Sequence, residues 1–287
     1  MRRLAMLGVG FVATTLLAWA GSFVTPDALD RKLLLALNPD RPVPILDAVM
    51  IATTDYAIPY VVILLLCCEL AAEARLRNWI RREQLLLGFG VLGVGVAALV
   101  WMHFNATFVH RAVPIAMTPV IAVTFLWVGS RLRRFDAAAL LRVRHAFLLT
   151  LVSITLAEVT LRCLHATGVA RSRPFDVANA WWNGGLRIIR DEYVRGIHSY
   201  PSGHAVAICA LLAPLFWIAR ERALRAALVA LAALVVYSRV YVAAHYPSDA
   251  IAGAAIGLAL GTLVTLSSGD HSRSDVQNSA RRPPAAP

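Results

Sequence analysis

The segment Tyr-Pro-Ser-Gly-His, residues 200–204, leads directly into a long apolar run, residues 204–219. Serine is a favoured helix N-cap, and glycine lets the backbone approach a ligand closely. The sequence therefore predicts that a helix begins here, capped by Ser202. Free N–H groups and the helix dipole at such a start form an anion site, with His204 at its edge. A plain helix cap beside an interfacial histidine is the alternative.

Similar apolar runs recur along the chain and predict an all-α, polytopic transmembrane helical bundle. The chain has 287 residues, of which 59% are hydrophobic, whereas soluble domains are about 45–50% apolar. Each run approaches the roughly 20 residues that cross a bilayer as a helix, so we expect about eight spans. The expected spans are residues 4–24, 56–72, 85–104, 112–130, 145–165, 204–219, 223–242 and 248–266.

Two segments near the N-terminus have their own predictions. The first run follows Arg2 and Arg3, and we expect it to remain as a membrane anchor, with a cleaved signal peptide as the alternative. Residues 25–55 contain Pro26, Pro39, Pro42 and Pro44, which break helices. We therefore expect a loop there, with short amphipathic pieces lying at the membrane interface.

Arginines are concentrated in alternate connections between the expected spans. The positive-inside rule then places both termini in the cytoplasm. Loops 165–204 and 238–249 fall on the opposite side, so we expect a multi-pass protein of the cell membrane with a periplasmic site. Arginine used almost without lysine, together with abundant alanine, favours a bacterial inner membrane. The arginine-rich connections hold Arg75, Arg77, Arg81 and Arg82, then Arg131, Arg133, Arg134, Arg142 and Arg144, then Arg220, Arg222 and Arg225.

The net charge of +11 does not indicate nucleic acid binding, because the arginines cluster between apolar runs as membrane proteins require. The four cysteines lie within apolar runs, and their spacing indicates neither zinc nor a disulfide framework. Loop 165–204 is unusual in holding several arginines on the outer side. Balance by acidic residues and lipid head groups is one interpretation, and an anionic ligand is the other. The loop arginines are Arg171, Arg173, Arg187, Arg190 and Arg195.

A second histidine, His245, lies four residues before Asp249 at the start of the last expected span. In a helical turn, this spacing brings the carboxylate near the imidazole. A carboxylate on one ring nitrogen sets the tautomer and leaves the other nitrogen free to attack. Attack on phosphorus would form a covalent phosphohistidine. An interfacial histidine beside a helix-capping aspartate is the alternative.

Arg239 and Arg173 are candidate anion ligands. Arg239 lies at the outer end of an expected span, where an arginine needs an anion or a carboxylate partner. Arg173 precedes Pro174 and is therefore expected in an extended segment. Guanidinium groups match phosphate oxygens in a bidentate manner. Contact with lipid head groups is the alternative for each arginine.

Together these pieces resemble the signature of the type 2 phosphatidic acid phosphatase superfamily, which also includes vanadium haloperoxidases. That signature consists of Lys-x6-Arg-Pro, then Pro-Ser-Gly-His, then Ser-Arg-x5-His-x3-Asp. The second piece matches at residues 201–204 and the third at residues 238–249. The resemblance covers roughly residues 150–266. It implies a six-helix core with three spans before the first piece, whereas we count five here.

The first piece of the signature matches only at Arg173-Pro174, because Ala166 stands where the lysine would lie. Arg171 is the nearest substitute for that charge, with Arg162 as the second candidate. A pocket without this cation would favour a slow or altered enzyme.

The resemblance implies a role for each matching residue. His245 would be the nucleophile, Asp249 its orienting partner and His204 the general acid. The resemblance implies no metal and no cofactor. The residues that would bind the phosphoryl oxygens are Arg173, Ser202, Gly203 and Arg239, with Arg171 as the substitute cation.

We therefore expect an integral membrane lipid phosphatase that hydrolyses a lipid phosphomonoester or pyrophosphate. Residues 1–144 would hold N-terminal spans, residues 145–266 the catalytic membrane region, and residues 267–287 a disordered cytoplasmic tail. The expected partners are a lipid phosphate and membrane lipids, without nucleic acid, and the oligomeric state stays open. Trp181 and Trp182 are expected in the interfacial aromatic belt.

Four other functions remain open at this point. One is a phosphotransferase that uses the same phosphohistidine, and another is a catalytically weak lipid-phosphate binder. A vanadate haloperoxidase is disfavoured because the spans favour a lipid substrate. A transporter would more often place an ionisable residue deep in a span, and the candidates are Glu69, Glu73 and Glu158.

Overall fold

The computed structural model describes residues 2–24, 28–107, 112–168, 171–174, 186–189 and 198–269, without the side chains of residues 2, 99–107 and 112–117. In this part of the chain the regular elements are helices, joined by one isolated bridge between Arg171 and His198. The all-α prediction is confirmed. The helices are α1 (Arg2–Gly21), α2 (Ala28–Leu37), α3 (Pro44–Leu76), α4 (Arg82–Thr107), α5 (Ala112–Leu132), α6 (Ala137–Ala166), α8 (Gly203–Ile218), α9 (Arg222–Tyr241) and α10 (Pro247–Ser268).

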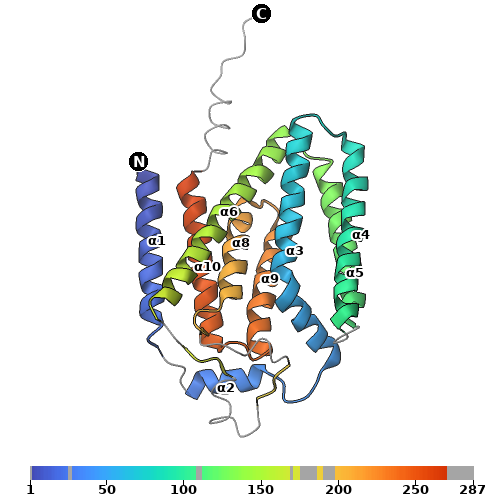
Figure 1. Cartoon of the computed structure of the whole chain (residues 1–287). Helices are drawn as coiled ribbons and strands as arrows, with labels where there is room; N and C mark the ends of the chain where they lie inside the picture. The colour runs from blue at the N-terminus through green and yellow to red at the C-terminus, as the bar shows by residue number, and fades with distance from the viewer. Residues whose placement is uncertain are drawn as a thin grey trace, which may run out of the picture.

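Among the described residues, five helices are long and apolar enough to cross a membrane: α1, α3, α6, α9 and α10. Helix α8 is apolar but shorter. The prediction of a loop over residues 25–55 is wrong for its last part, because α3 already begins at Pro44. Proline is well tolerated at the first helical position, where its missing N–H has no partner to lose. Pro59 lies inside α3, whose first part is tilted against the rest (Figure 1), as expected where proline removes a helical hydrogen bond.

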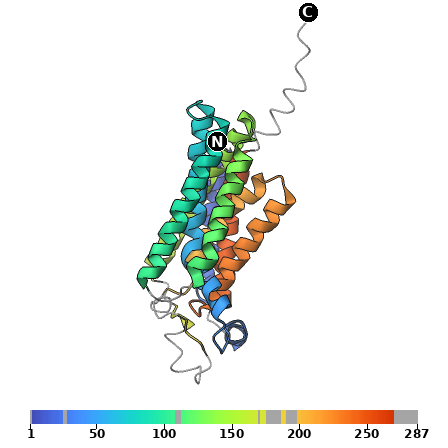
Figure 2. The same cartoon turned by 90° about the vertical axis from the view of Figure 1, so that its right-hand side faces the viewer.

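Helices α1, α3, α6, α8, α9 and α10 form the main bundle, and the α4–α5 hairpin lies to one side of them (Figure 1). Helix α4 packs mainly on α5, and α5 joins the bundle through α3. The remaining long helices, α1, α3, α6, α8, α9 and α10, pack against one another. The α4–α5 hairpin is therefore peripheral to the other long helices. Figure 2 views α2 nearly along its axis, beneath the ends of the long helices.

The two ends of the bundle differ in chemistry. Helix α1 begins and α10 ends at one end, where the arginine-rich connections α3–α4, α5–α6 and α8–α9 also lie (Figure 1). Glu69 and Glu73 belong to this end, because Arg144 lies 3.5 Å from Glu69 and 2.8 Å from Glu73. These two acids are thus paired near a helix end. The described residues between α6 and α8, which are 171–174, 186–189 and 198–202, lie at the opposite end together with the turn that joins α9 to α10 (Figure 1).

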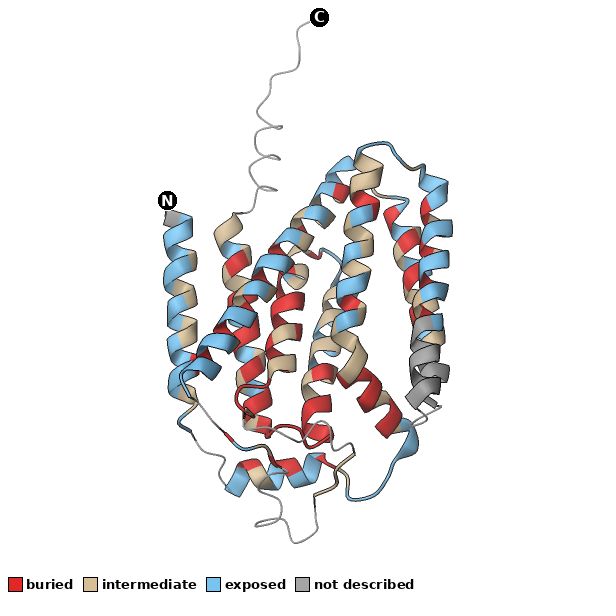
Figure 3. Cartoon of the chain, in the orientation of Figure 1, coloured by how far each residue is buried: buried red, intermediate tan, exposed pale blue. Residues whose placement is uncertain are grey.

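Helices α8 and α10 pack closely because glycines line their contact. A Cβ at Gly253 would lie 2.6 Å from the carbonyl oxygen of Ser202, and one at Gly257 would meet the carbonyl oxygen of Val206. Both obstacles are backbone atoms, which cannot rotate away. This close contact seats the start of α10 against the start of α8. Figure 3 shows the resulting concentration of buried residues in α8, α10 and the turn between α9 and α10.

We expect Gly257→Ala to destabilise the fold by about 1–3 kcal/mol, because the added methyl group must push α10 away from α8. Gly88→Ala is a matched control, since a Cβ at Gly88 meets open space. Alanine should stabilise a helix interior there by roughly 0.5–1 kcal/mol. Thermal unfolding of the purified protein in detergent measures both changes. Equal melting temperatures for the two variants would contradict the close contact.

Candidate active site

Three separated segments meet at the end of the bundle opposite the arginine-rich connections. Residues 171–174 run beside residues 198–199, with the N–H of Ser199 donating to the carbonyl oxygen of Arg171 at 2.9 Å. The N–H of Ser202 donates to the carbonyl oxygen of Asp249 at 3.0 Å. The structure therefore brings all three motif segments to one place, on the starts of α8 and α10. The Tyr200–Pro201 peptide between them is cis.

His245 lies in the turn between α9 and α10 and is 2% exposed. Its Nδ1 lies 2.7 Å from the carbonyl oxygen of Ser199. A carbonyl oxygen only accepts, so Nδ1 carries the proton and Nε2 keeps its lone pair. This corrects the sequence-based expectation that Asp249 orients His245. The backbone carbonyl of Ser199 contacts the ring directly, and this tautomer leaves Nε2 with a free lone pair.

Asp249 is fully buried in the first turn of α10. Its Oδ2 accepts from the Ser199 hydroxyl at 2.6 Å and from the N–H of Tyr246 at 3.2 Å. Its Oδ1 is paired with Nη1 of Arg171. Asp249 thus acts on His245 through Ser199, whose hydroxyl binds the aspartate while its carbonyl binds the imidazole. No sequence pattern indicates Ser199, because a backbone carbonyl needs no particular side chain and the contact of its hydroxyl with Asp249 spans 50 positions.

The two substitutes considered for the missing lysine are both paired with acids. Arg171 is buried, pairs with Asp249 and has its guanidinium carbon 4.6 Å from the centre of the Tyr200 ring. Arg162 is on the outside of α6, with 80% of its side chain exposed, and pairs with Glu158 at 2.7 Å. Ala166 is exposed at the end of the same helix. The described residues therefore place neither substitute arginine beside the two histidines.

Arg173 and Arg239 surround the histidines instead. The positive charges of both arginines act on His204 and also on His245, so the four groups lie near one another, and we call the region between them the anion space. Arg239 is 2% exposed. Ser202 adds a buried hydroxyl oxygen that has no hydrogen-bond partner among the described residues. This arrangement concentrates N–H donors and positive charge where an anion with several oxygen atoms fits.

Helix α8 contributes its N-terminus to the same space. Ser202 is the N-cap residue, and its hydroxyl makes no capping bond, which leaves both the hydroxyl and the first N–H groups of the helix available to an anion. Gly203 opens the helix, and a Cβ there would make only an ordinary contact of 3.7 Å with Leu161. Packing among the described residues thus does not require this glycine. Because Gly203 has no side chain, it leaves room beside the anion space.

Burial lowers the pKa of His245 well below its usual value, and the charges of Arg239, Arg173 and His204 lower it further. The hydrogen bond to the Ser199 carbonyl opposes this shift. A histidine with a lowered pKa stays neutral at all pH values above that pKa. His245 is therefore neutral across the physiological range, as a nitrogen nucleophile must be.

We expect the acid limb of kcat/KM for phosphate release to have its midpoint below pH 6.5. That limb reports the free enzyme group that must lose a proton, which here is His245. Rates from pH 4 to 8, corrected for ionisation of the substrate phosphate, measure the midpoint. A midpoint at or above 6.5 would contradict the position of His245 beside two arginines.

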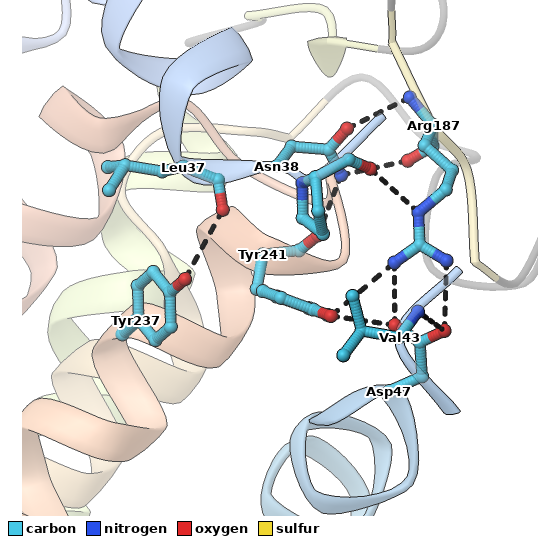
Figure 4. Close-up of polar contacts among 8 residues, drawn as sticks. Leu37, Asn38, Val43, Asp47, Arg187, Tyr237 and Tyr241 are labelled. Atoms are coloured by element: carbon cyan, nitrogen blue, oxygen red, sulfur yellow. Dashed lines mark hydrogen bonds and ion pairs between the residues drawn. The ribbon is translucent and has the colours of Figure 1, made fainter. Parts of the chain in front are cut away.

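Polar contacts that the sequence analysis did not predict hold the site segments in place. Arg187 makes a bidentate ion pair with Asp47 at the start of α3, at 2.9 and 2.6 Å, and Tyr241 donates to the same carboxylate at 2.7 Å (Figure 4). Arg187 therefore follows the acid-balanced interpretation of the loop arginines. Ser238 of the third motif segment accepts from Thr54 of α3 at 2.8 Å. These pairs join distant parts of the chain, and no local sequence pattern predicts them.

Some predictions concern residues outside the described ranges: Trp181, Trp182, Arg190, Arg195 and residues 270–287 of the expected tail. Within the described ranges, no group of three or more His, Cys, Asp or Glu residues is arranged to hold a metal ion.

Comparison with known proteins gives one match. The model of one protein family, described as the PAP2 superfamily, matches residues 145–273. No curated protein and no solved structure matches the chain. The matched range contains most of α6, all of α8, α9 and α10, and every residue named around the anion space.

Proposed function

Because this chain belongs to the PAP2 superfamily through residues 145–273, we propose that it is an integral membrane lipid phosphatase. Members of the superfamily are generally phosphatases, and the apolar helices fit a multi-pass membrane protein. The proposed substrate is a lipid phosphomonoester or pyrophosphate. The observation that carries the proposal is the common space in which Arg173 and Arg239 act on both His204 and His245.

In the proposed reaction, the phosphoryl oxygens bind to Arg173, Arg239, the Ser202 hydroxyl and the N-terminus of α8. Nε2 of His245 attacks phosphorus, and the bond from phosphorus to the leaving oxygen breaks. The negative charge of the bound phosphate offsets Arg173 and Arg239, which otherwise disfavour a protonated His204, and His204 then gives its proton to that oxygen. The phosphohistidine then reacts with water, whose proton passes to His204, and inorganic phosphate leaves. Both histidines return to their starting protonation states.

Charge placement supports an active site on the outer face of the membrane. The arginine-rich connections lie at the opposite end of the bundle from His245 (Figure 1). By the positive-inside rule, that arginine-rich end faces the cytoplasm. We propose that the site faces the periplasm of a bacterial inner membrane. A lipid phosphate in the outer leaflet would then present its head group to the site while its chains stay in the bilayer.

The test is phosphate release in detergent from a panel of lipid phosphates and lipid pyrophosphates, with and without EDTA. We expect EDTA-resistant release from at least one member of the panel, and the preferred lipid identifies the substrate class. Product analysis with added lipid alcohols separates hydrolysis from phosphoryl transfer. Release that EDTA abolishes, or transfer without free phosphate, would overturn the proposed hydrolase.

A lipid-phosphate binder with weak catalysis is the second candidate, and one observation favours it. Arg171 and Arg162 are both paired with acids, so the charge of each candidate substitute for the missing lysine is already balanced by a carboxylate. Saturable binding of a lipid phosphate by the folded protein, with no release of phosphate from any panel member, would support the binder.

A further inference from the structure

Helix α2 is fastened to the first turn of α10, the helix that follows His245. Oδ1 of Asp30 accepts from the N–H of Ser248 at 3.0 Å, and Oδ2 accepts from the Ser248 hydroxyl at 2.6 Å. Asp30 is 7% exposed. Ser248 is next to Asp249, so the carboxylate of Asp30 holds the turn from which Asp249 reaches Ser199.

Helix α2 makes two further contacts that include residues before His245 in the sequence. Leu34 is fully buried and packs with Tyr246, Ala250 and Val240. Just past the helix, Nδ2 of Asn38 donates to the carbonyl oxygen of Tyr241 at 2.7 Å (Figure 4). The polar and apolar contacts of α2 therefore lie on both sides of His245 in the sequence, at the end of α9 and at the start of α10.

The stripe of leucines beside this buried face is exposed. Leu29, Leu33 and Leu37 are 62%, 43% and 38% exposed, and their i, i+4, i+8 spacing puts them on one side of the helix. Lys32 is also exposed and borders this stripe, about 60° around the helix from Leu29 and about 100° from Leu33. Leucines in water forgo the favourable transfer of their side chains into an apolar medium. A helix with this pattern lies in a membrane interface, with leucines in the acyl region and the charge toward water.

The position of α2 in the fold points to the lipid leaflet as the covering partner. Helix α1 precedes α2 in the chain and carries Trp19 in its last turn. The Trp19 ring meets the Phe23 ring edge-on, with 4.9 Å between the ring centres. Both aromatic side chains are exposed, at 41% and 66%, and exposed aromatic residues at a span end mark the membrane interface. Helix α2 follows beyond this end of α1 and runs across the bundle axis (Figures 1 and 2).

We propose that α2 is an interfacial helix that rests in the lipid leaflet beside the active site and, through Asp30, positions the turn that carries His245. The proposal rests on the proposed phosphatase function and adds a coupling between membrane contact and catalysis. Asp30 and Ser248 are positioning residues in this account, because neither touches the reacting atoms. The seating of α2 in the leaflet keeps α10 aligned with α8.

The seating is tested without any activity. Single cysteines at Leu29, Leu33 or Lys32 are labelled with an environment-sensitive fluorophore in full-length protein whose four native cysteines are replaced by alanine. The protein is reconstituted in vesicles of phosphatidylethanolamine and phosphatidylglycerol. We expect brominated lipids to quench the labels at positions 29 and 33 more strongly than the label at position 32, which lies at the edge of the leucine stripe. Equal quenching at all three positions, or none, would overturn the interfacial seating.

The coupling is tested with a water-soluble aryl phosphate, which reaches the site without the membrane. We expect kcat of the wild type to be at least about fivefold higher in vesicles than in detergent micelles, in the range of typical couplings between sites. Asp30→Ala and the double variant Leu29→Ser, Leu33→Ser should lose this difference, and Lys32→Ala should keep it. A variant that is merely less stable would lose activity in both environments alike.

The outcomes separate the two proposals. A wild type that releases no phosphate in either environment would contradict the phosphatase, and the labelled cysteines would still report on the seating. A wild type that is active but equally fast in vesicles and micelles would overturn the coupling. So would an Asp30→Ala variant that keeps the full difference.

Discussion

His245→Ala is expected to reduce phosphate release by about 10⁴-fold or more, because the nucleophile of a two-step displacement has no substitute. The loss should be the same for every leaving group. Alanine leaves the backbone turn in place, so the variant should fold and still bind a lipid phosphate. Phosphate release and binding in detergent measure the two properties separately.

His204→Ala is the comparison variant, because it removes the proposed general acid and keeps the proposed nucleophile. A general acid contributes about 10²–10⁴-fold when the leaving oxygen is basic. An aryl phosphate has a leaving group that departs without a proton, so its hydrolysis should lose far less in this variant than that of an alkyl lipid phosphate. After rapid quenching, His204→Ala should also retain labelled phosphohistidine with the aryl substrate. His245→Ala should form none.

The opposite pattern would reassign the two histidines. If His204→Ala lost all activity with both substrates while His245→Ala retained the aryl reaction, the nucleophile would be His204. The tautomer of His245 argues against that outcome, because the Ser199 carbonyl holds the proton on Nδ1 and leaves Nε2 free.

Arg171→Ala is expected to destabilise the protein by about 3–5 kcal/mol, because it leaves the carboxylate of Asp249 buried without its cation. In the ion pair, 9% of the Arg171 side chain and none of the Asp249 side chain is exposed. An arginine that served only as a phosphate ligand would behave differently. Its loss would raise KM and leave the melting temperature of the empty protein unchanged or higher.

Arg162→Ala is the matched control, since Arg162 also pairs with an acid but lies on the surface of α6. An exposed pair of this kind contributes about 0.3–0.5 kcal/mol. Thermal unfolding of both variants in detergent, together with KM for a lipid phosphate, measures the contrast. Equal melting temperatures for the two variants, with a raised KM only for Arg171→Ala, would return Arg171 to the role of a phosphate ligand.

Much of this protein is predictable from residue types and short spacings. Apolar runs of spanning length predict an all-helical bundle, and the pattern of arginines predicts that the motif loops lie at one end. The Pro-Ser-Gly-His segment places a helix start beside a histidine, and α8 begins at Gly203. The start of α3 is not predictable from the prolines alone. Proline breaks a helix interior, but Pro44 stands at the first helical position, where proline is tolerated.

Only the tertiary structure decides which partner each polar side chain takes. Asp249 is four residues from His245, yet its buried partners are Arg171, 78 positions away, and Ser199, 50 positions away. His245 is held by a backbone carbonyl 46 positions away, and Asp30 reaches Ser248 across 218 positions. Local spacing limits which groups can meet within one helix. Pairing between helices depends on how the bundle closes, because burial makes an unsatisfied charge too costly and selects whichever partner the packing brings within reach.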